Sequence, residues 1–317
     1  MRTGTGTSWP ARQSVMMAAG LTVVALAAGA GGAPQAGAAA SGARHIRLDA
    51  ARPGVPPHGS RDESLRLARR EIALIVLPHG TRRLPQHPVP RRLRQPSLIP
   101  AIHDTVDIYR LFALRGAMNR SFRFLRTHPP AGMTVQATGS SSDRRHVVDE
   151  RDVTFAPRQL PGGIYSLQLT VEIVPARHGR SLMRADVQVI WYPPRSAAEH
   201  LTAANFRAVK ITSFSYDKKP RTVTRTLTGR TSIARLARLL NGLRAAPGVV
   251  VPCPISATSF RLVFEPVAGH SRVTVDTTTC VSDTIRVGGV AQPALADYGK
   301  VDQLADRLLR AQRRTLA

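Results

Sequence analysis

The chain has 317 residues, which is enough for two domains with buried cores, and its hydrophobic fraction of 43% excludes a wholly disordered protein. Its 45 Lys and Arg residues against 20 Asp and Glu residues give a formal net charge of +25. Such a charge favours an anionic partner, although an arginine excess can also reflect a GC-rich genome, and composition leaves both interpretations open.

The N-terminal segment has the pattern of a signal peptide. Arg2 and Arg12 precede an apolar run over 15–28, and the small residues of "GAPQAGAAASGA" follow it, as signal peptidase requires. We predict a signal peptide over 1–40, a flexible leader over 41–59, and a secreted, extracytoplasmic mature protein. An uncleaved membrane anchor is the less favoured alternative, because the apolar run is short for a span of about 20 residues.

The residues after the leader predict an N-terminal α+β domain over 60–201. Ser60 and Glu63 form a capping-box pattern that opens a helix, with Leu65, Ala68, Ile72 and Ile75 on one face, before Pro78 ends it. Residues 78–100 contain six prolines and no acid, which indicates an extended, basic surface connection. We expect polyanion binding by five arginines of this connection: Arg82, Arg83, Arg91, Arg92 and Arg94.

Further elements of this domain follow from periodicity. We predict a strand over 106–114, a helix over 117–127, and strands over 133–138, 147–156, 164–174 and 182–192. The last two strands alternate apolar and polar residues, so we expect one face to be core and the other to be solvated.

A C-terminal α+β domain is predicted over 202–317, after the Pro193-Pro194 pair. Strands over 207–215 and 221–227 precede a helix over 231–243, a hairpin within 260–275, a strand over 284–287 and a closing helix. The closing helix has an apolar stripe: Val301, Leu304, Ala305, Leu308 and Leu309. The predicted fold class is therefore α+β, with two antiparallel-sheet halves, each packed with helices.

The two cysteines, Cys253 and Cys280, stand outside the ends of the predicted hairpin. If the turn is centred between Pro266 and Val267, residues that face each other have numbers summing to 533, and the two cysteines lie opposite. We therefore predict a disulfide that closes the C-terminal hairpin and stabilises the fold by about 3–4 kcal/mol on the chain-entropy model. Metal binding or thiol catalysis is the alternative, but the C-x-x-C spacing is absent.

Several stretches resemble a group of secreted actinobacterial proteins of unknown function. The similar pieces are "LARREIALIVLPHGTRRLP", "FLRTHPPAGMTVQATGSSS", "LMRADVQVIWYPPRSAAEH", "SIARLARLLNGL", "PCPISATSFRLVF" and "VGGVAQPAL", within 61–317. The resemblance implies the same paired cysteines, and it implies no reaction, cofactor or catalytic residue. The chain departs from the group at Tyr109 and Phe112, where paired tryptophans are usual.

The sequence contains no G-x-S-x-G, H-E-x-x-H, G-x-x-x-x-G-K-[ST] or dinucleotide-binding glycine motif. We predict no cofactor and no metal site. Three pairings of histidine with carboxylates have the residue types of an acid–base or metal site. They are His103 with Asp104 and Asp107, His146 with Asp149 and Glu150, and Glu199 with His200. Because each lies at the edge of a predicted element, we interpret them as solvated surface.

These observations favour an exported, non-catalytic protein that associates electrostatically with anionic cell-envelope polymers or a lipid surface. The alternative is a secreted hydrolase that uses a cluster of histidine and carboxylates. Specific nucleic-acid binding is disfavoured, because the chain has an export signal, an aromatic content of only 5% and no nucleic-acid-binding motif.

Overall fold

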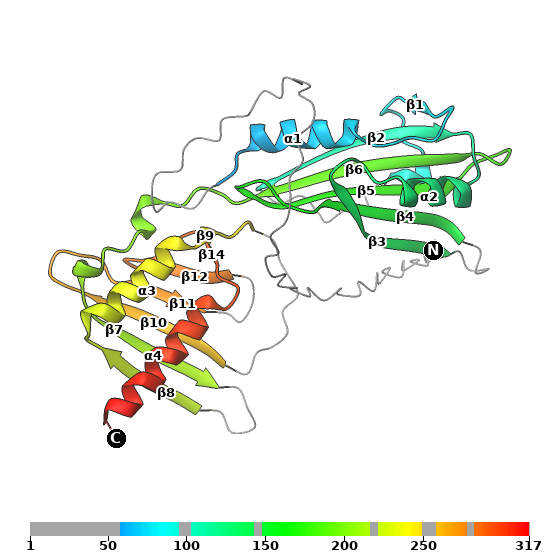
Figure 1. Cartoon of the computed structure of the whole chain (residues 1–317). Coiled ribbons are helices and arrows are strands. Elements are labelled where there is room, and N and C mark those ends of the chain that lie inside the picture. The colour runs from blue at the N-terminus through cyan, green and yellow to red at the C-terminus, as the bar shows by residue number, and fades with distance from the viewer. Residues whose placement is uncertain are drawn as a thin grey trace, which may run out of the picture. The chain divides into compact units, whose positions relative to one another are not determined.

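The computed structural model describes residues 58–94, 103–142, 148–215, 221–248, 258–277 and 282–316. Two antiparallel sheets and four α-helices make up these residues, and Figure 1 shows their order along the chain. The predicted α+β class is confirmed. No helix among these residues is long and apolar enough to span a membrane.

The N-terminal sheet has six strands in the order β1-β2-β6-β5-β4-β3. Apolar side chains that alternate along β5 and β6 share a core with α1 and α2, so both helices lie on the same face of this sheet. The elements are α1 (Arg61–Ala73), β1 (Arg82–Leu84), the 3₁₀ turn η1 (Arg91–Leu93), β2 (Thr105–Leu114), α2 (Met118–Thr127), β3 (Met133–Ser142), β4 (Val148–Pro157), β5 (Ile164–Pro175) and β6 (Ser181–Trp191).

Helix α1 begins where the sequence predicts and ends earlier. The Ser60 hydroxyl accepts a hydrogen bond from the backbone N–H of Glu63 at 3.3 Å, which satisfies one of the free amides of the first turn. Leu74 terminates the helix, so Ile75 packs against the core from beyond the last turn.

The connection after α1 has anchors that the sequence did not predict. β1 pairs with the edge of β2, with Leu84 opposite Leu111, and the fully buried side chain of Leu93 from η1 packs with Leu111 and Val174. Most of the residues over 82–94 are exposed, so this stretch lies on the surface while Leu93 joins a small core beneath it.

The prediction that β5 and β6 turn a solvated face away from the helices is wrong. The outward side chains of these strands are buried although they are polar: Thr170, Glu172, Arg184, Asp186 and Gln188. Alternation along a strand distinguishes its two faces, but it does not reveal whether another segment covers the polar one.

The C-terminal sheet has eight strands, with the order β8-β7-β10-β11-β12-β14-β9 and with β13 paired to β12. Figure 1 shows α3 and α4 crossing the strands, and their apolar stripes share one core with the sheet, including all five residues predicted for the closing helix. The elements are η2 (Ala197–Glu199), η3 (Ala203–Asn205), β7 (Phe206–Ser215), β8 (Arg221–Leu227), α3 (Arg230–Gly242), β9 (Arg244–Ala245), β10 (Thr258–Pro266), β11 (Val273–Asp276), β12 (Ser282–Val287), β13 (Val290–Ala291), β14 (Leu295–Ala296) and α4 (Lys300–Leu316).

The two halves are alike in architecture but differ in strand order. In the N-terminal half, β2 pairs with the last strand of the β3–β6 meander, whereas in the C-terminal half β7 pairs with β10, the first strand of the meander that follows α3. The likeness is therefore limited to helices packed on one face of an antiparallel meander.

The register of the C-terminal hairpin differs from the predicted one. Leu262 faces Val275 and Phe264 faces Val273, so facing residues have numbers that sum to 537 rather than 533. The loop between the strands is longer than a tight turn, with Gly269 in the left-handed region at φ +81°. This register no longer places Cys253 opposite Cys280. Both cysteines lie outside the described residues, and their disulfide stays a prediction.

Candidate functional site

A basic strap, which we define as residues 82–94, combines a fixed backbone with exposed cationic side chains. Its two ends are anchored by the pairing of β1 with β2 and by Leu93, whose side chain is fully buried. Between these anchors the Gln86 side-chain amide donates to the backbone carbonyl of Tyr109 at 2.9 Å. The strap therefore follows a defined path over the outward face of the N-terminal sheet.

Arg184 of β6 binds the C-terminal end of the strap from beneath. Its Nη1 donates to the carbonyl of Leu93 at 2.9 Å and to that of Arg94 at 3.2 Å. Its remaining nitrogens form a two-point ion pair with Asp186, with Nη2 at 2.7 Å from Oδ1, and the guanidinium lies 4.4 Å from the centre of the Tyr109 ring. Because Arg184 and Asp186 neutralise each other, Asp186 does not offset the charge of the strap.

The five arginines predicted to bind polyanions all lie on this strap, and all five are exposed. In the parts of the chain that the structure describes, none of them forms an ion pair. Apart from Nε of Arg94, which donates to the carbonyl of Val89 at 3.5 Å, their side chains keep their hydrogen-bond donors available while the backbone beneath them is held in place.

The acids near the strap are held in surroundings that disfavour their charge. Asp107 is exposed as a residue, but partial burial of its carboxyl raises its pKa to about 6, with a further increase from the negative charge of Asp186 and an opposing effect of Arg184. Burial also raises the pKa of Asp186 itself, against the hydrogen bonds from Arg184. Arg184 is therefore the residue of the outward face that stabilises the ionised form of Asp186.

The three clusters of histidine and carboxylates have different surroundings. His103 is exposed, and burial raises the pKa of the neighbouring Asp104. Asp149 accepts a hydrogen bond from the Ser141 hydroxyl at 3.0 Å, while His146 lies outside the described residues.

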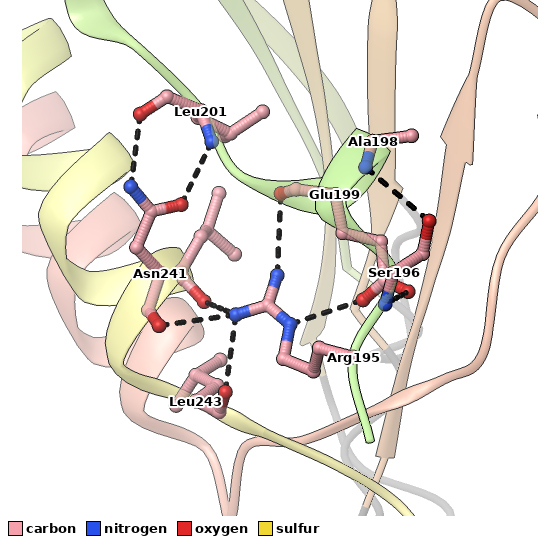
Figure 2. A network of polar contacts seen from close by, with 8 residues as sticks. Arg195, Ser196, Ala198, Glu199, Leu201, Asn241 and Leu243 are labelled. Carbon is pink, nitrogen blue, oxygen red and sulfur yellow. Dashed lines mark hydrogen bonds and ion pairs between the residues drawn. The ribbon is translucent and has the colours of Figure 1, made fainter. Parts of the chain in front are cut away.

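Glu199 of the third cluster is fully buried, so its interpretation as solvated surface is wrong. One carboxylate oxygen accepts from Nε of Arg195 at 3.0 Å, and the other accepts from the backbone N–H of Ser196 at 3.0 Å. Figure 2 shows this arrangement, in which the Ser196 hydroxyl in turn accepts from the N–H of Ala198. Both carboxylate oxygens are occupied, which argues against an acid–base role for Glu199.

Arg195 joins this capping box to the C-terminal end of α3. Its Nη1 lies 2.7 Å from the carbonyl oxygen of Leu240 and 3.1 Å from those of Asn241 and Leu243 (Figure 2). The side-chain amide of Asn241 completes the connection, because it bonds to both the N–H and the carbonyl of Leu201 at 2.8 and 2.9 Å. A cation at this end of a helix is also favoured by the helix dipole.

The network places residues 195–201 with the C-terminal core. Leu201 is buried in the same hydrophobic cluster as α3 and α4. The predicted division between 60–201 and 202–317 stays a prediction, but the segment just before Thr202 makes its principal contacts with residues that follow it.

Sequence reasoning missed both Arg184 and Arg195. For Arg184 a signal existed, because Asp186 stands two positions further along a predicted strand and therefore on the same face. For Arg195 the spacing to Glu199 suits an ion pair across one helical turn, but the carbonyls at the end of α3 lie more than 40 positions away in sequence. Tertiary packing alone brings these groups together.

No group of three or more His, Cys, Asp or Glu side chains suited to a metal ion occurs among the residues that the structure describes. Comparisons with protein-family models, with curated proteins and with solved structures find no match for this chain.

Proposed function

We propose that the protein is an exported, non-catalytic polyanion-binding protein that associates with anionic cell-envelope polymers through the basic strap. The observation that supports this proposal is the set of five exposed arginines on a backbone held by Leu93 and Arg184. The secretory signal predicted over 1–40 places the mature chain where such polymers occur.

The geometry favours binding because the strap does not have to order itself on contact with a polymer. Immobilising a rotamer-rich side chain costs about 0.5–1.5 kcal/mol, and ordering a backbone adds to that cost. In this protein folding has already ordered the backbone of the strap, so binding does not incur that part of the entropy cost. Arginine also offers paired donors that match carboxylate and phosphate oxygens, so the strap suits wall polymers that carry either group.

The proposal is tested with the mature chain on immobilised heparin and on isolated anionic wall polymer. We expect retention that weakens steeply with salt, because exposed charges are screened once the Debye length falls to about 3 Å near 1 M salt. The test variant replaces Arg82, Arg83, Arg91, Arg92 and Arg94 with glutamine.

A matched control removes the same charge elsewhere. Five exposed arginines of the C-terminal half are replaced with glutamine: Arg207, Arg230, Arg235, Arg238 and Arg286. We expect the strap variant to elute at clearly lower salt than the control variant, with both retaining thermal stability. Equal losses would show that bulk charge, not the strap, carries the binding, and retention that persists at 1 M salt would contradict the electrostatic mechanism.

A further inference from the structure

Three of the five tyrosines of this aromatic-poor chain meet in one place, which we call the tyrosine cluster: Tyr165, Tyr192 and Tyr298. The hydroxyls of Tyr192 and Tyr298 lie 3.5 Å apart, and the rings of Tyr165 and Tyr192 pack edge to face at 5.5 Å. Three hydroxyls have three donor protons, and the contact between Tyr192 and Tyr298 uses one of them. At least one phenolic donor is left for another acceptor.

Arg244 brings a cation to the same cluster. Its guanidinium carbon lies 4.5 Å from the centre of the Tyr192 ring, and β9, which carries it, pairs with Ala296, two residues before Tyr298. In contrast to Arg184 and Arg195, whose side chains bind carboxylates and carbonyls, the side chain of Arg244 has no hydrogen bond or ion pair within the described residues. Its side chain is half-buried, so its N–H donors are restricted in direction.

Tyr298 occupies a backbone conformation that does not suit it. Its φ is +54°, in the left-handed region, where a non-glycine residue costs of order 1 kcal/mol. The residue is nevertheless 52% exposed, so packing of its ring offsets little of that cost. Strained residues of this kind concentrate at ligand sites, and the adjacent Gly299, at φ +76°, shows that the turn itself is suited to glycine.

We propose that the tyrosine cluster and Arg244 form a binding site for an oxyanion, a carboxylate or phosphate group presented by a ligand at the surface. The guanidinium supplies the charge, the unused phenolic donor supplies a directed hydrogen bond, and the exposed ring of Tyr298 covers the apolar part of the ligand. The site is separate from the basic strap, and its occupation does not depend on the strap's function.

The surroundings keep the phenols in the form that such a site needs. Burial raises the pKa of Tyr165, and the neighbouring Tyr192 phenol raises it further, against an opposing effect of Tyr298. Although Tyr298 is exposed as a residue, partial burial of its phenol and the two neighbouring phenols raise its pKa as well. The hydroxyls of Tyr165 and Tyr298 therefore stay protonated at neutral pH.

The test uses the mature protein and two small probes, sodium glucuronate for a carboxylate and glycerol 3-phosphate for a phosphate, against sodium chloride at equal ionic strength. Binding is followed by isothermal titration calorimetry, whose signal does not depend on the tyrosine chromophores. We expect a saturable signal with a Kd of about 1 mM for at least one probe. Arg244→Gln is expected to weaken it about tenfold and Tyr298→Phe less strongly, whereas Arg238→Gln on α3 leaves it unchanged.

A further variant separates ligand binding from structural support. Tyr298→Gly relieves the backbone strain but adds unfolded-state entropy, so its thermal midpoint stays close to that of the parent protein while the probe signal is lost. A signal from glucuronate alone identifies a carboxylate ligand, one from glycerol 3-phosphate alone identifies a phosphate, and signals from both identify a general oxyanion site. The proposal is overturned if neither probe gives a signal, or if the variants lower stability without changing the signal. None of these results depends on the strap arginines, so failure here leaves the proposed function standing.

Discussion

Replacing Arg195 with alanine removes the cation at the centre of the network in Figure 2 and leaves its partners buried. The Arg195 side chain is 3% exposed and that of Glu199 is 0% exposed, so water does not readily take over the lost contacts. Removal of one member of such a buried pair costs about 3–5 kcal/mol, because the other charge is left without compensation. Against a typical total stability of about 5–15 kcal/mol, this loss is large.

A double-mutant cycle separates the ion pair from the helix-end contacts of Arg195. We expect Arg195→Ala to lower the free energy of unfolding by about 4 kcal/mol and Glu199→Gln by about 2 kcal/mol, since glutamine keeps an acceptor for the N–H of Ser196. The double variant is expected to lose less than the sum, by about 2 kcal/mol, because no uncompensated buried carboxylate remains.

Urea unfolding followed by circular dichroism measures these differences, provided that the slope with denaturant is unchanged. Arg238→Ala, an exposed arginine on α3, is the control and is expected to change stability by no more than about 0.5 kcal/mol. A loss below about 1 kcal/mol for Arg195→Ala, or strict additivity in the cycle, would refute the reasoning.

Three further outcomes follow from other parts of the chain. Because the folded-state pKa of Asp107 lies near 6, above its ordinary 3.8, the fold favours the protonated acid, and its contribution to stability is lost as pH rises from about 4 to 6. Asp107→Asn is therefore expected to stabilise the protein at pH 7.5 by about 1 kcal/mol, after allowance for solvent screening, and to have no effect at pH 3.5. The difference in thermal midpoint between the variant and the parent protein measures both effects, and the opposite pH trend would contradict the assigned cause. The denatured but unreduced protein, recovered from an oxidising compartment, should give no alkylation of Cys253 or Cys280, whereas complete labelling of both would exclude their disulfide. A fragment that begins at Pro194 should unfold cooperatively and at higher urea than one that begins at Thr202, because it keeps Arg195, Glu199 and Leu201; equal midpoints would show that the network adds nothing to the C-terminal half.

The helices and the longer strands follow from sequence because their signals are local. The stripe from Val301 to Leu309 repeats with the period of a helix, and every one of its predicted members is buried. The buried polar face of β6 was not predictable in the same way, because part of its cover comes from Leu93, which contacts Arg184 across 91 positions of sequence. The register of the hairpin failed for a related reason, since it depends on the length of the loop around Gly269 and not on the alternation within the strands.

The sequence predicted which arginines make up the candidate site, but not the contacts that hold the strap in place. The five strap arginines are visible in the sequence as a run of basic residues without acids. Their support is not visible, because the apolar residues around them are too few to predict a core, and the carbonyls that Arg184 binds belong to the backbone. Tyr298 gave no sequence signal either, since its left-handed conformation is a property of the turn before α4.

The different attachment of β2 and β7 to their meanders has a consequence for the order in which the two sheets are completed. β2 joins β6 through pairs such as Thr105 with Ile190, 85 positions apart, whereas β7 joins β10 through pairs such as Ser215 with Thr258, 43 positions apart. Closure of the longer segment costs more chain entropy, and non-local pairing slows folding. We therefore expect the C-terminal half, which the ribosome makes last, to complete its sheet first. In the N-terminal half, β2, which carries Tyr109, pairs only after β6 has formed, and the strap packs on the sheet after that pairing.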